Sequence, residues 1–170
     1  MTEVRIRGFE PGDWPAVRAI VDEVLAAGET YAMARLDDAG ARDFWLGGTS
    51  DVAEVAVAEV DGVVVGSARM GPNRPAQGAH VATASFMVGS GARGRGVGRA
   101  LGEHAVARLR DRGFAAVQFN AVVESNTVAV DLWRSLGFSV VGTVPGAFRR
   151  PSGELVGLHV MHLDLGQGSA

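Results

Sequence analysis

The sequence predicts an α/β domain in which helices flank a mixed, mostly antiparallel sheet. Three observations predict this class. An Asp-Gly pair separates two β-rich runs, the hydrophobic period then changes from alternating to helical after a glycine-rich segment, and alternation returns behind that helix. A chain of 170 residues lies in the range of one domain. We therefore expect a single domain over residues 1–166 and a short tail over residues 167–170.

The N-terminal segment predicts one strand and two helices. Residues 4–7 alternate in polarity and are expected to form the first strand. Asp13 is a candidate N-cap of the helix that follows, and Gly28 is expected to end that helix. A second, shorter helix is expected over residues 38–46.

A three-stranded antiparallel meander is expected next. Two β-rich runs, residues 52–60 and 63–70, are separated by Asp61-Gly62, which is a strong signal for a two-residue hairpin. A loop rich in proline and glycine then leads to a third run over residues 80–88.

The second half of the chain predicts one parallel crossover. A helix over residues 96–112 is expected to join strand 80–88 to strand 114–123, so these two strands should be parallel. Ligands of open α/β sheets favour the carboxyl ends of strands around such a crossover. The remaining elements are a helix over residues 126–136 and two strands over residues 138–144 and 155–165.

The glycine-rich segment at this crossover has the chemistry of an anion site. Five glycines lie between Gly89 and Gly98, and each lets the backbone turn tightly or approach a ligand closely. The peptide N–H groups of residues 95–98 are expected to be the unpaired first-turn donors of the helix, whose dipole favours an anion. Three cations surround the turn, namely Arg93, Arg95 and Arg99. The pattern predicts a pyrophosphate site.

Two other interpretations of this segment stay open at this point. A flexible basic turn without a ligand would contain the same glycines. Residues 89–94 also satisfy the dinucleotide-binding pattern G-x-G-x-x-G, although the helical spacing begins only near Gly96, beyond the third glycine. A Walker A motif is excluded because the sequence contains no Lys.

Two motifs resemble those of the GNAT superfamily of N-acetyltransferases. Residues 93–98, Arg-Gly-Arg-Gly-Val-Gly, resemble the Q/R-x-x-G-x-G/A signature whose turn holds the pyrophosphate of acetyl-CoA. Residues 124–138 resemble the N-x-x-A-x-x-L-[YW]-x-x-x-G-F helix of the same superfamily. The resemblance extends over residues 3–165. It implies a GNAT-like acyl-CoA N-acyltransferase fold, acetyl-CoA as cofactor without a metal, and acetyl transfer to an amine.

A looser similarity points to the fungal acetyltransferases of proline analogues such as azetidine-2-carboxylate. It rests on residues 119–120 and 124–126 before Leu132-Trp133, and on residues 28–31, Gly-Glu-Thr-Tyr, ahead of Phe44-Trp45. The acceptors that this similarity implies are amino acids or imino-acid analogues.

The superfamily resemblance also implies where the cofactor lies. Strands 80–88 and 114–123 would diverge, with the pantetheine arm between them, and a backbone N–H near residues 86–88 would polarise the thioester carbonyl. The amine would attack directly, with coenzyme A thiolate as leaving group. The implied cofactor-binding residues are Phe86, Met87, Val88, Arg93, Gly94, Arg95, Gly96, Val97, Gly98, Arg99, Asn126 and Trp133.

Three side chains are candidates for catalytic roles. Asn120 is expected on the polar face of strand 114–123 together with Gln118 and Val122. There it faces a ligand groove or has structural partners, because an unpaired buried amide costs about 1–3 kcal/mol. Asn126 is a candidate helix N-cap that, by resemblance, also reaches the cofactor or the acceptor. Tyr31, the only phenol in the sequence, lines the acceptor pocket or lies at the surface.

The proton transfers have no assigned acid or base. Trp133 stands where many GNAT enzymes have Tyr, and an indole N–H donates hydrogen bonds but is no usable acid. Trp133 is therefore expected to contact pantetheine or to be a plain core residue. Freeing an alkylamine with a pKa near 10.4 at pH 7 costs about 4.6 kcal/mol. No carboxylate lies within residues 80–88, and the nearest titratable groups in sequence are Glu124 and His80.

Composition narrows the remaining classes. The absence of Cys excludes disulfides, thiolate metal sites and a thiol nucleophile. A net charge of −3 opposes a nucleic-acid binder. No apolar run approaches the roughly 18 residues of a membrane span, and residues 1–5 do not have the charged-then-apolar pattern of a signal segment. We therefore expect no membrane partner and a cytoplasmic location.

The expected partner is a small-molecule amine, and a homodimer stays open. A protein N-terminus or a drug amine is an alternative acceptor within the same class of enzyme. A non-catalytic acyl-CoA-binding sensor is the alternative outside that class, because Trp133 replaces the usual Tyr and the base is missing. Arg149 and Arg150, expected in a loop, are either solvated charges or contacts for an acceptor carboxylate.

Overall fold

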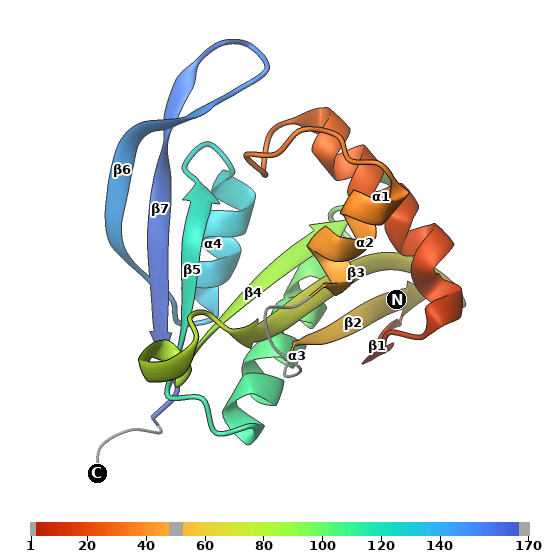
Figure 1. Ribbon diagram of the computed structural model, residues 1–170, viewed down its shortest axis with the longest axis horizontal. Helices are drawn as coiled ribbons and strands as arrows, with labels where there is room; N and C mark the ends of the chain where they lie inside the picture. Colours follow the sequence, from red (N-terminus) through yellow and green to blue (C-terminus); the bar gives the residue numbers. More distant parts are fainter. Residues whose placement is uncertain (1–2, 48–52, 167–170) are drawn as a thin grey trace.

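The computed structural model describes residues 3–47 and 53–166. One sheet of seven strands, in the order β1-β2-β3-β4-β5-β7-β6, forms its centre (Figure 1). Neighbouring strands are antiparallel except β4 and β5, which are parallel. The predicted mixed α/β class and its single parallel crossover are thus confirmed. The strands are β1 (Val4–Gly8), β2 (Glu54–Val60), β3 (Val63–Pro72), β4 (Val81–Val88), β5 (Ala116–Val123), β6 (Ser139–Arg149) and β7 (Leu155–Asp164).

Helices cover both faces of the sheet (Figure 1). On one face, α1 (Trp14–Ala27) and α2 (Asp38–Leu46) enclose an apolar core around Trp45 and Val57. On the other face, α3 (Val97–Asp111) and α4 (Thr127–Ser135) enclose a second core around Leu101 and Met161. Three short 3-10 segments complete the fold, namely η1 (Pro11–Asp13), η2 (Ala76–Gly78) and η3 (Ser90–Ala92). No helix among the described residues has the length and hydropathy of a membrane span.

Local sequence signals placed several boundaries correctly. Asp61 and Gly62 both have positive φ, 52° and 77°, as the predicted two-residue hairpin requires. Gly28, with φ of 65°, ends α1 in the left-handed conformation. The second helix has its predicted bounds. Val52 of the predicted second strand and the tail over residues 167–170 lie outside the described residues.

Two expectations about side chains and strand length are corrected. Asp13 is the N-cap residue of α1, as predicted, but its side chain makes no capping hydrogen bond to the helix. It accepts hydrogen bonds from the Arg7 guanidinium at 2.7 and 2.8 Å and from the Glu10 N–H at 2.7 Å, because a nearby cation competes successfully for the carboxylate. The sixth strand, expected to end at Val144, continues to Arg149, with register shifts that keep it paired to β7.

A β-bulge in β5 changes which side chains share a face. Phe119 pairs with Met161 and Val122 with His159, so the two residues between Phe119 and Val122 oppose a single residue of β7. After the bulge, Val122 packs against the core that contains Phe119. The expectation that Val122 shares the face of Asn120 is therefore wrong, because strict alternation ends at the bulge.

Candidate active site

The two parallel strands separate soon after they pair. Val81 pairs with Ala116 and Ala82 with Val117, and no further pair forms between β4 and β5. A groove of about 980 Å³ opens where the strands diverge. Its lining combines residues 83–88 of β4, residues 119–123 of β5, the glycine-rich turn and the start of α4. The divergence implied by the family resemblance is present.

The β4 backbone presents unpaired peptide groups to this groove. Asn73 N–H donates to Val81 O at 2.8 Å and Gly89 N–H to Val65 O at 2.9 Å. The odd-numbered residues of β4 therefore direct their peptide groups at β3, and the even-numbered ones direct theirs toward β5. Beyond Ala82, no β5 backbone pairs with these even-numbered residues.

Tyr31 occupies one of those peptide groups. Its hydroxyl donates to the Phe86 carbonyl oxygen at 2.9 Å, and its ring meets Phe44 edge-on at 6.0 Å. Tyr31 is half-buried and lines the groove, and burial raises the pKa of its phenol well above its usual range. The hydroxyl is therefore a hydrogen-bond donor at neutral pH. The sequence left open whether Tyr31 lines a pocket or lies at the surface, and in the structure it lines the groove. A catalytic role for Tyr31 stays a prediction.

Asn120 lies in the groove and also has structural partners, so both alternatives hold together. Its amide donates to Asn73 Oδ1 at 2.7 Å and accepts from Asn73 Nδ2 at 3.2 Å. Gln118 Nε2 donates to the same Asn120 oxygen at 2.9 Å. Asn120 itself is exposed and lines the groove. Sequence reasoning missed Asn73, because nothing in a loop 47 residues earlier signals this contact.

The glycine-rich turn lines another part of the groove. Gly96, with φ of 81°, is the N-cap of α3. The first bond into the helix runs from Ala100 N–H to Gly96 O at 3.0 Å, so the N–H groups of residues 97–99 precede the helical ladder. Arg95 N–H donates to Ala92 O at 3.4 Å. Including Arg95 among the free donors was therefore wrong, because the helix starts later and η3 uses that group.

Most of the predicted turn residues line the groove, and two do not. The lining includes Arg93, Gly94, Gly96, Val97 and Gly98. Arg95 and Arg99 are outside it.

The Arg99 side chain points to α4 and to its own helix. It donates to Ser135 Oγ at 2.8 Å and pairs with Glu103 at 3.4 Å. Cofactor contacts by Arg95 and Arg99 stay predictions.

The start of α4 and an aromatic cluster form the floor of the groove. Asn126 Oδ1 accepts from Ala129 N–H at 3.3 Å, which confirms the predicted N-cap. Trp133 is only 7% exposed, and its ring lies 4.7 Å from that of Phe86 and 4.9 Å from that of Phe119. Asn126 and Trp133 both line the groove, so Trp133 is a core residue and a groove residue at once.

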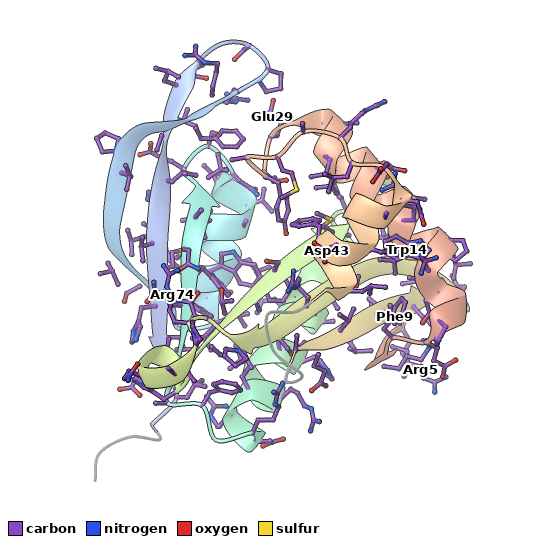
Figure 2. The ribbon with its side chains drawn as sticks, viewed as in Figure 1. Arg5, Phe9, Trp14, Glu29, Asp43 and Arg74 are labelled. Carbon is purple, nitrogen blue, oxygen red and sulfur yellow. The ribbon has the colours of Figure 1, made fainter. Side chains whose placement is uncertain are left out.

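One carboxylate, Glu29, belongs to the groove lining. It lies in the loop after α1, on the side of the β6–β7 hairpin (Figure 2). Its carboxylate accepts a hydrogen bond from Arg150 Nε at 2.9 Å. Arg150 also pairs with Glu154 at 2.8 Å, so it is not a free cation for an acceptor carboxylate. Sequence reasoning missed this ion pair, which joins segments 121 residues apart.

Glu124 and His80, the titratable residues that the sequence analysis placed nearest to the groove, lie outside it. Glu124 Oε2 accepts the Gly157 N–H at 2.8 Å and thereby ties the end of β5 to β7. Neither Glu124 nor His80 belongs to the groove lining. Among the residues that the structure describes, no group of His, Cys, Asp or Glu side chains is arranged as a metal site.

Comparison with known proteins bears on this architecture. The model of the acetyltransferase (GNAT) family matches residues 16–138. A GCN5-related N-acetyltransferase from Kribbella flavida is 53% identical, with a TM-score of 0.91 over 95% of this chain and 97% of that chain. Ribosomal-protein-alanine N-acetyltransferase from Brucella melitensis is 31% identical, with a TM-score of 0.83 over 94% and 99% of the two chains.

Two further matches concern the cofactor and the fungal similarity. The putative acetyltransferase yncA from Salmonella typhimurium, solved with its cofactor acetyl-CoA, is 25% identical with a TM-score of 0.84 over 99% and 98% of the two chains. N-acetyltransferase aca1 from Schizosaccharomyces pombe is 29% identical over 103 residues, which are 59% of this chain. The match covers 49% of aca1, so it spans about half the length of that relative.

The fold, the groove between diverging strands and the turn at its end define the class of acetyl-CoA-dependent N-acetyltransferases. Acetyl-CoA is the cofactor of this class. The chain belongs to the GNAT family of acetyltransferases, as the two sequence motifs indicate.

Proposed function

We propose that this protein transfers the acetyl group of acetyl-CoA to the amine of a small molecule by direct attack, with amino acids and imino-acid analogues as candidate acceptors. The observation that carries the proposal is the composition of the groove. Unpaired peptide groups of β4 and a helix N-terminus suit the cofactor, and uncharged polar side chains face the same space.

The cofactor would bind along β4 and end at the turn. The N–H groups of residues 97–99 and the α3 dipole suit the pyrophosphate, and Arg93 adds a positive charge in the lining. The pantetheine arm would pair with the free peptide groups of β4. The N–H groups of Phe86 and Val88 point away from β3 and are the proposed donors for the thioester oxygen, whereas the Phe86 carbonyl oxygen already accepts from Tyr31.

The acceptor would bind between Tyr31 and Asn120. The Asn73 and Gln118 side chains fix the orientation of the Asn120 amide, so that amide is a preorganised polar contact. The ion pair between Glu29 and Arg150 borders the same space.

Deprotonating the amine is a larger energetic problem for this reaction than protonating the leaving thiolate. At pH 7 a free alkylamine costs about 4.6 kcal/mol, whereas a thiolate with a pKa of about 8.5 is only about 2 kcal/mol from its neutral form. Tyr31 stays protonated and is therefore no base, and Trp133 is no acid. Catalysis in this proposal depends on positioning and on oxyanion-type stabilisation.

A second candidate acceptor is the N-terminal amine of a protein. The likeness to a ribosomal-protein-alanine N-acetyltransferase favours it, at 31% identity over nearly the whole chain. Such an acceptor would need room for a peptide beyond its first residue. Peptides that begin with alanine therefore belong in any test of the acceptor.

The expected homodimer and the expected cytoplasmic location stay predictions.

The test is thiol release from acetyl-CoA across a panel of free amino acids, imino acids, drug amines and alanyl peptides. We expect saturable release with one class of small amine and slower release with peptides. Fastest release with the peptides would favour the second candidate. Tight acetyl-CoA binding without turnover on any amine would contradict the proposal and indicate a sensor.

A further inference from the structure

The chain between β4 and α3 has few hydrogen bonds to the rest of the fold. The last sheet bond of β4 is Gly89 N–H to Val65 O, and the first bond of α3 starts at Ala100. Residues 90–95 lie between Gly89 and the N-cap of α3 at Gly96. Their backbone hydrogen bonds are local, from Ala92 N–H to Gly89 O at 3.0 Å, from Arg93 N–H to Ser90 O at 3.3 Å and from Arg95 N–H to Ala92 O at 3.4 Å.

One side chain from another element reaches this segment. Glu23 of α1 accepts the Ser90 N–H with Oε1 at 2.8 Å. Among the described residues, this is the long-range hydrogen bond recorded for residues 90–95, and the other anchor is the buried methyl group of Ala92. Hydrogen bonding by the Ser90 hydroxyl, together with that by the Ser90 N–H, holds the pKa of the Glu23 carboxyl below its usual range, so Glu23 is charged at neutral pH.

A carboxylate so near a pyrophosphate site needs a reason, because its charge opposes the anion. The hydrogen bond supplies one, since a charged acceptor binds a peptide N–H more strongly than a neutral one. Arg93 lies close enough to act on the same carboxyl, which offsets part of the repulsion. Helix α1 also contributes Val24 and Ala27 to the groove. Glu23 thus connects the helix that leads to Tyr31 with the segment that leads to the turn.

We propose that Glu23 is a positioning residue for acetyl-CoA, which fixes the approach to the glycine-rich turn from helix α1. This inference rests on the proposed placement of the pyrophosphate at that turn. Without the hydrogen bond, residues 90–95 would sample more conformations, and cofactor binding would have to order them. The effect should fall on acetyl-CoA affinity and leave the chemical step intact.

The experiment measures the acetyl-CoA Kd by calorimetry and kcat at saturating acetyl-CoA. We expect Glu23→Ala to raise the Kd about tenfold, the effect of one lost charge-assisted hydrogen bond, with kcat within about twofold of wild type. Glu23→Gln keeps an oxygen acceptor and should restore most of the affinity. Asp22→Ala is the matched control, because Asp22 is on the same helix, is partly exposed and, within the described part of the chain, forms an ion pair with Arg18 alone.

A second variant, at the residue that donates the hydrogen bond, tests the same contact if Glu23→Ala does not fold. Ser90→Pro removes the same N–H, together with the Ser90 hydroxyl that also acts on Glu23, at the first position of η3, where proline is tolerated. Gly89 has the extended ψ of 144° that precedes proline. We expect the same rise in Kd, and no further rise when Glu23→Gln is added.

Three results would overturn the inference. The first is an unchanged Kd in Glu23→Ala and Ser90→Pro, and the second is a Glu23→Gln loss as large as that of Glu23→Ala. The third is a fall in kcat that matches the loss of affinity. Gly96→Asp separates this failure from that of the proposed function. If it weakens binding while Glu23→Ala does not, only the role of Glu23 fails; if neither does, the pyrophosphate placement fails too.

Discussion

The Tyr31 hydroxyl donates a hydrogen bond across 2.9 Å to the carbonyl oxygen of Phe86. This bond connects the loop after α1 to the strand along which the cofactor is proposed to bind. Because it satisfies a groove-facing carbonyl, it limits the peptide groups that acetyl-CoA can use. It also places the only phenol of the protein beside the proposed thioester position.

Replacing this phenol tests its place beside the acceptor. We expect Tyr31→Phe to raise the acceptor KM about tenfold, the effect of one lost hydrogen bond, and to leave the acetyl-CoA Kd within about twofold. Because burial raises the pKa of Tyr31, the hydroxyl stays protonated and the shape of the kcat profile from about pH 6 to pH 9 should be unchanged. An unchanged KM, or loss of a titration limb in the variant, would count against this role.

A negative charge at the turn should disrupt cofactor binding. Gly96→Asp is expected to raise the acetyl-CoA Kd at least about tenfold, because a carboxylate would face the pyrophosphate in a helix N-terminal field. Gly96→Asn is the matched control, since asparagine tolerates the left-handed φ of 81° and adds no charge. Equal Kd values for the two variants would show that the pyrophosphate binds elsewhere.

The indole of Trp133 should be dispensable for proton transfer. We expect Trp133→Phe to keep kcat within about tenfold, because no proton is donated there and the smaller ring keeps part of the aromatic contact with Phe86 and Phe119. Rapid-quench turnover measures this directly. A collapse in the rate with acetyl-CoA binding intact would assign chemistry to the indole N–H.

Asn120 should matter more than the residue that orients it. We expect Asn120→Ala to lower kcat/KM for the acceptor by about tenfold or more, because a preorganised amide is lost. Asn73→Ala should have a smaller effect, since Gln118 still holds the Asn120 oxygen at 2.9 Å. Steady-state kinetics with the best acceptor test both. Equal losses in the two variants would make the pair structural.

The ion pair between Arg7 and Asp13 should stabilise the fold by an amount that decreases at acid pH. Arg7 holds the pKa of the Asp13 carboxyl below its usual range, so its contribution is fully present above the unfolded pKa of about 3.9 and lost as pH falls through the lower folded pKa. We expect Asp13→Asn to lower the free energy of unfolding by about 1–3 kcal/mol at pH 7.

Urea unfolding at several pH values measures this contribution. The difference between wild type and Asp13→Asn should shrink from about pH 5 to about pH 2. Asp22→Asn, at a partly exposed position, serves as the control and should show little difference at any pH. A difference for Asp13→Asn that does not depend on pH would assign its effect to packing.

The sequence predicted features that depend on local chemistry. The Asp61-Gly62 hairpin, the end of α1 at Gly28 and the cap at Asn126 each follow from what one or two residues can do with their own backbone. The turn and the crossover were predicted because their glycines and hydrophobic period are contiguous.

Features that depend on distant segments were not predictable in this way. The bulge beside Asn120 arises from pairing with β7, and strict alternation gives no sign of it. Asn73, Glu23 and the partnership of Glu29 with Arg150 involve residues whose types are ordinary for loops and helix surfaces. Their roles depend on the elements that the fold brings beside them.

A crystal structure with coenzyme A would show whether the cofactor lies between β4 and β5 with its pyrophosphate at the turn. We expect pyrophosphate oxygens within about 2.7–3.2 Å of the N–H groups of residues 97–99, with the sulfur between Phe86 and Asn120. A pyrophosphate bound away from this turn, or a pantetheine arm outside the gap between the strands, would contradict this placement.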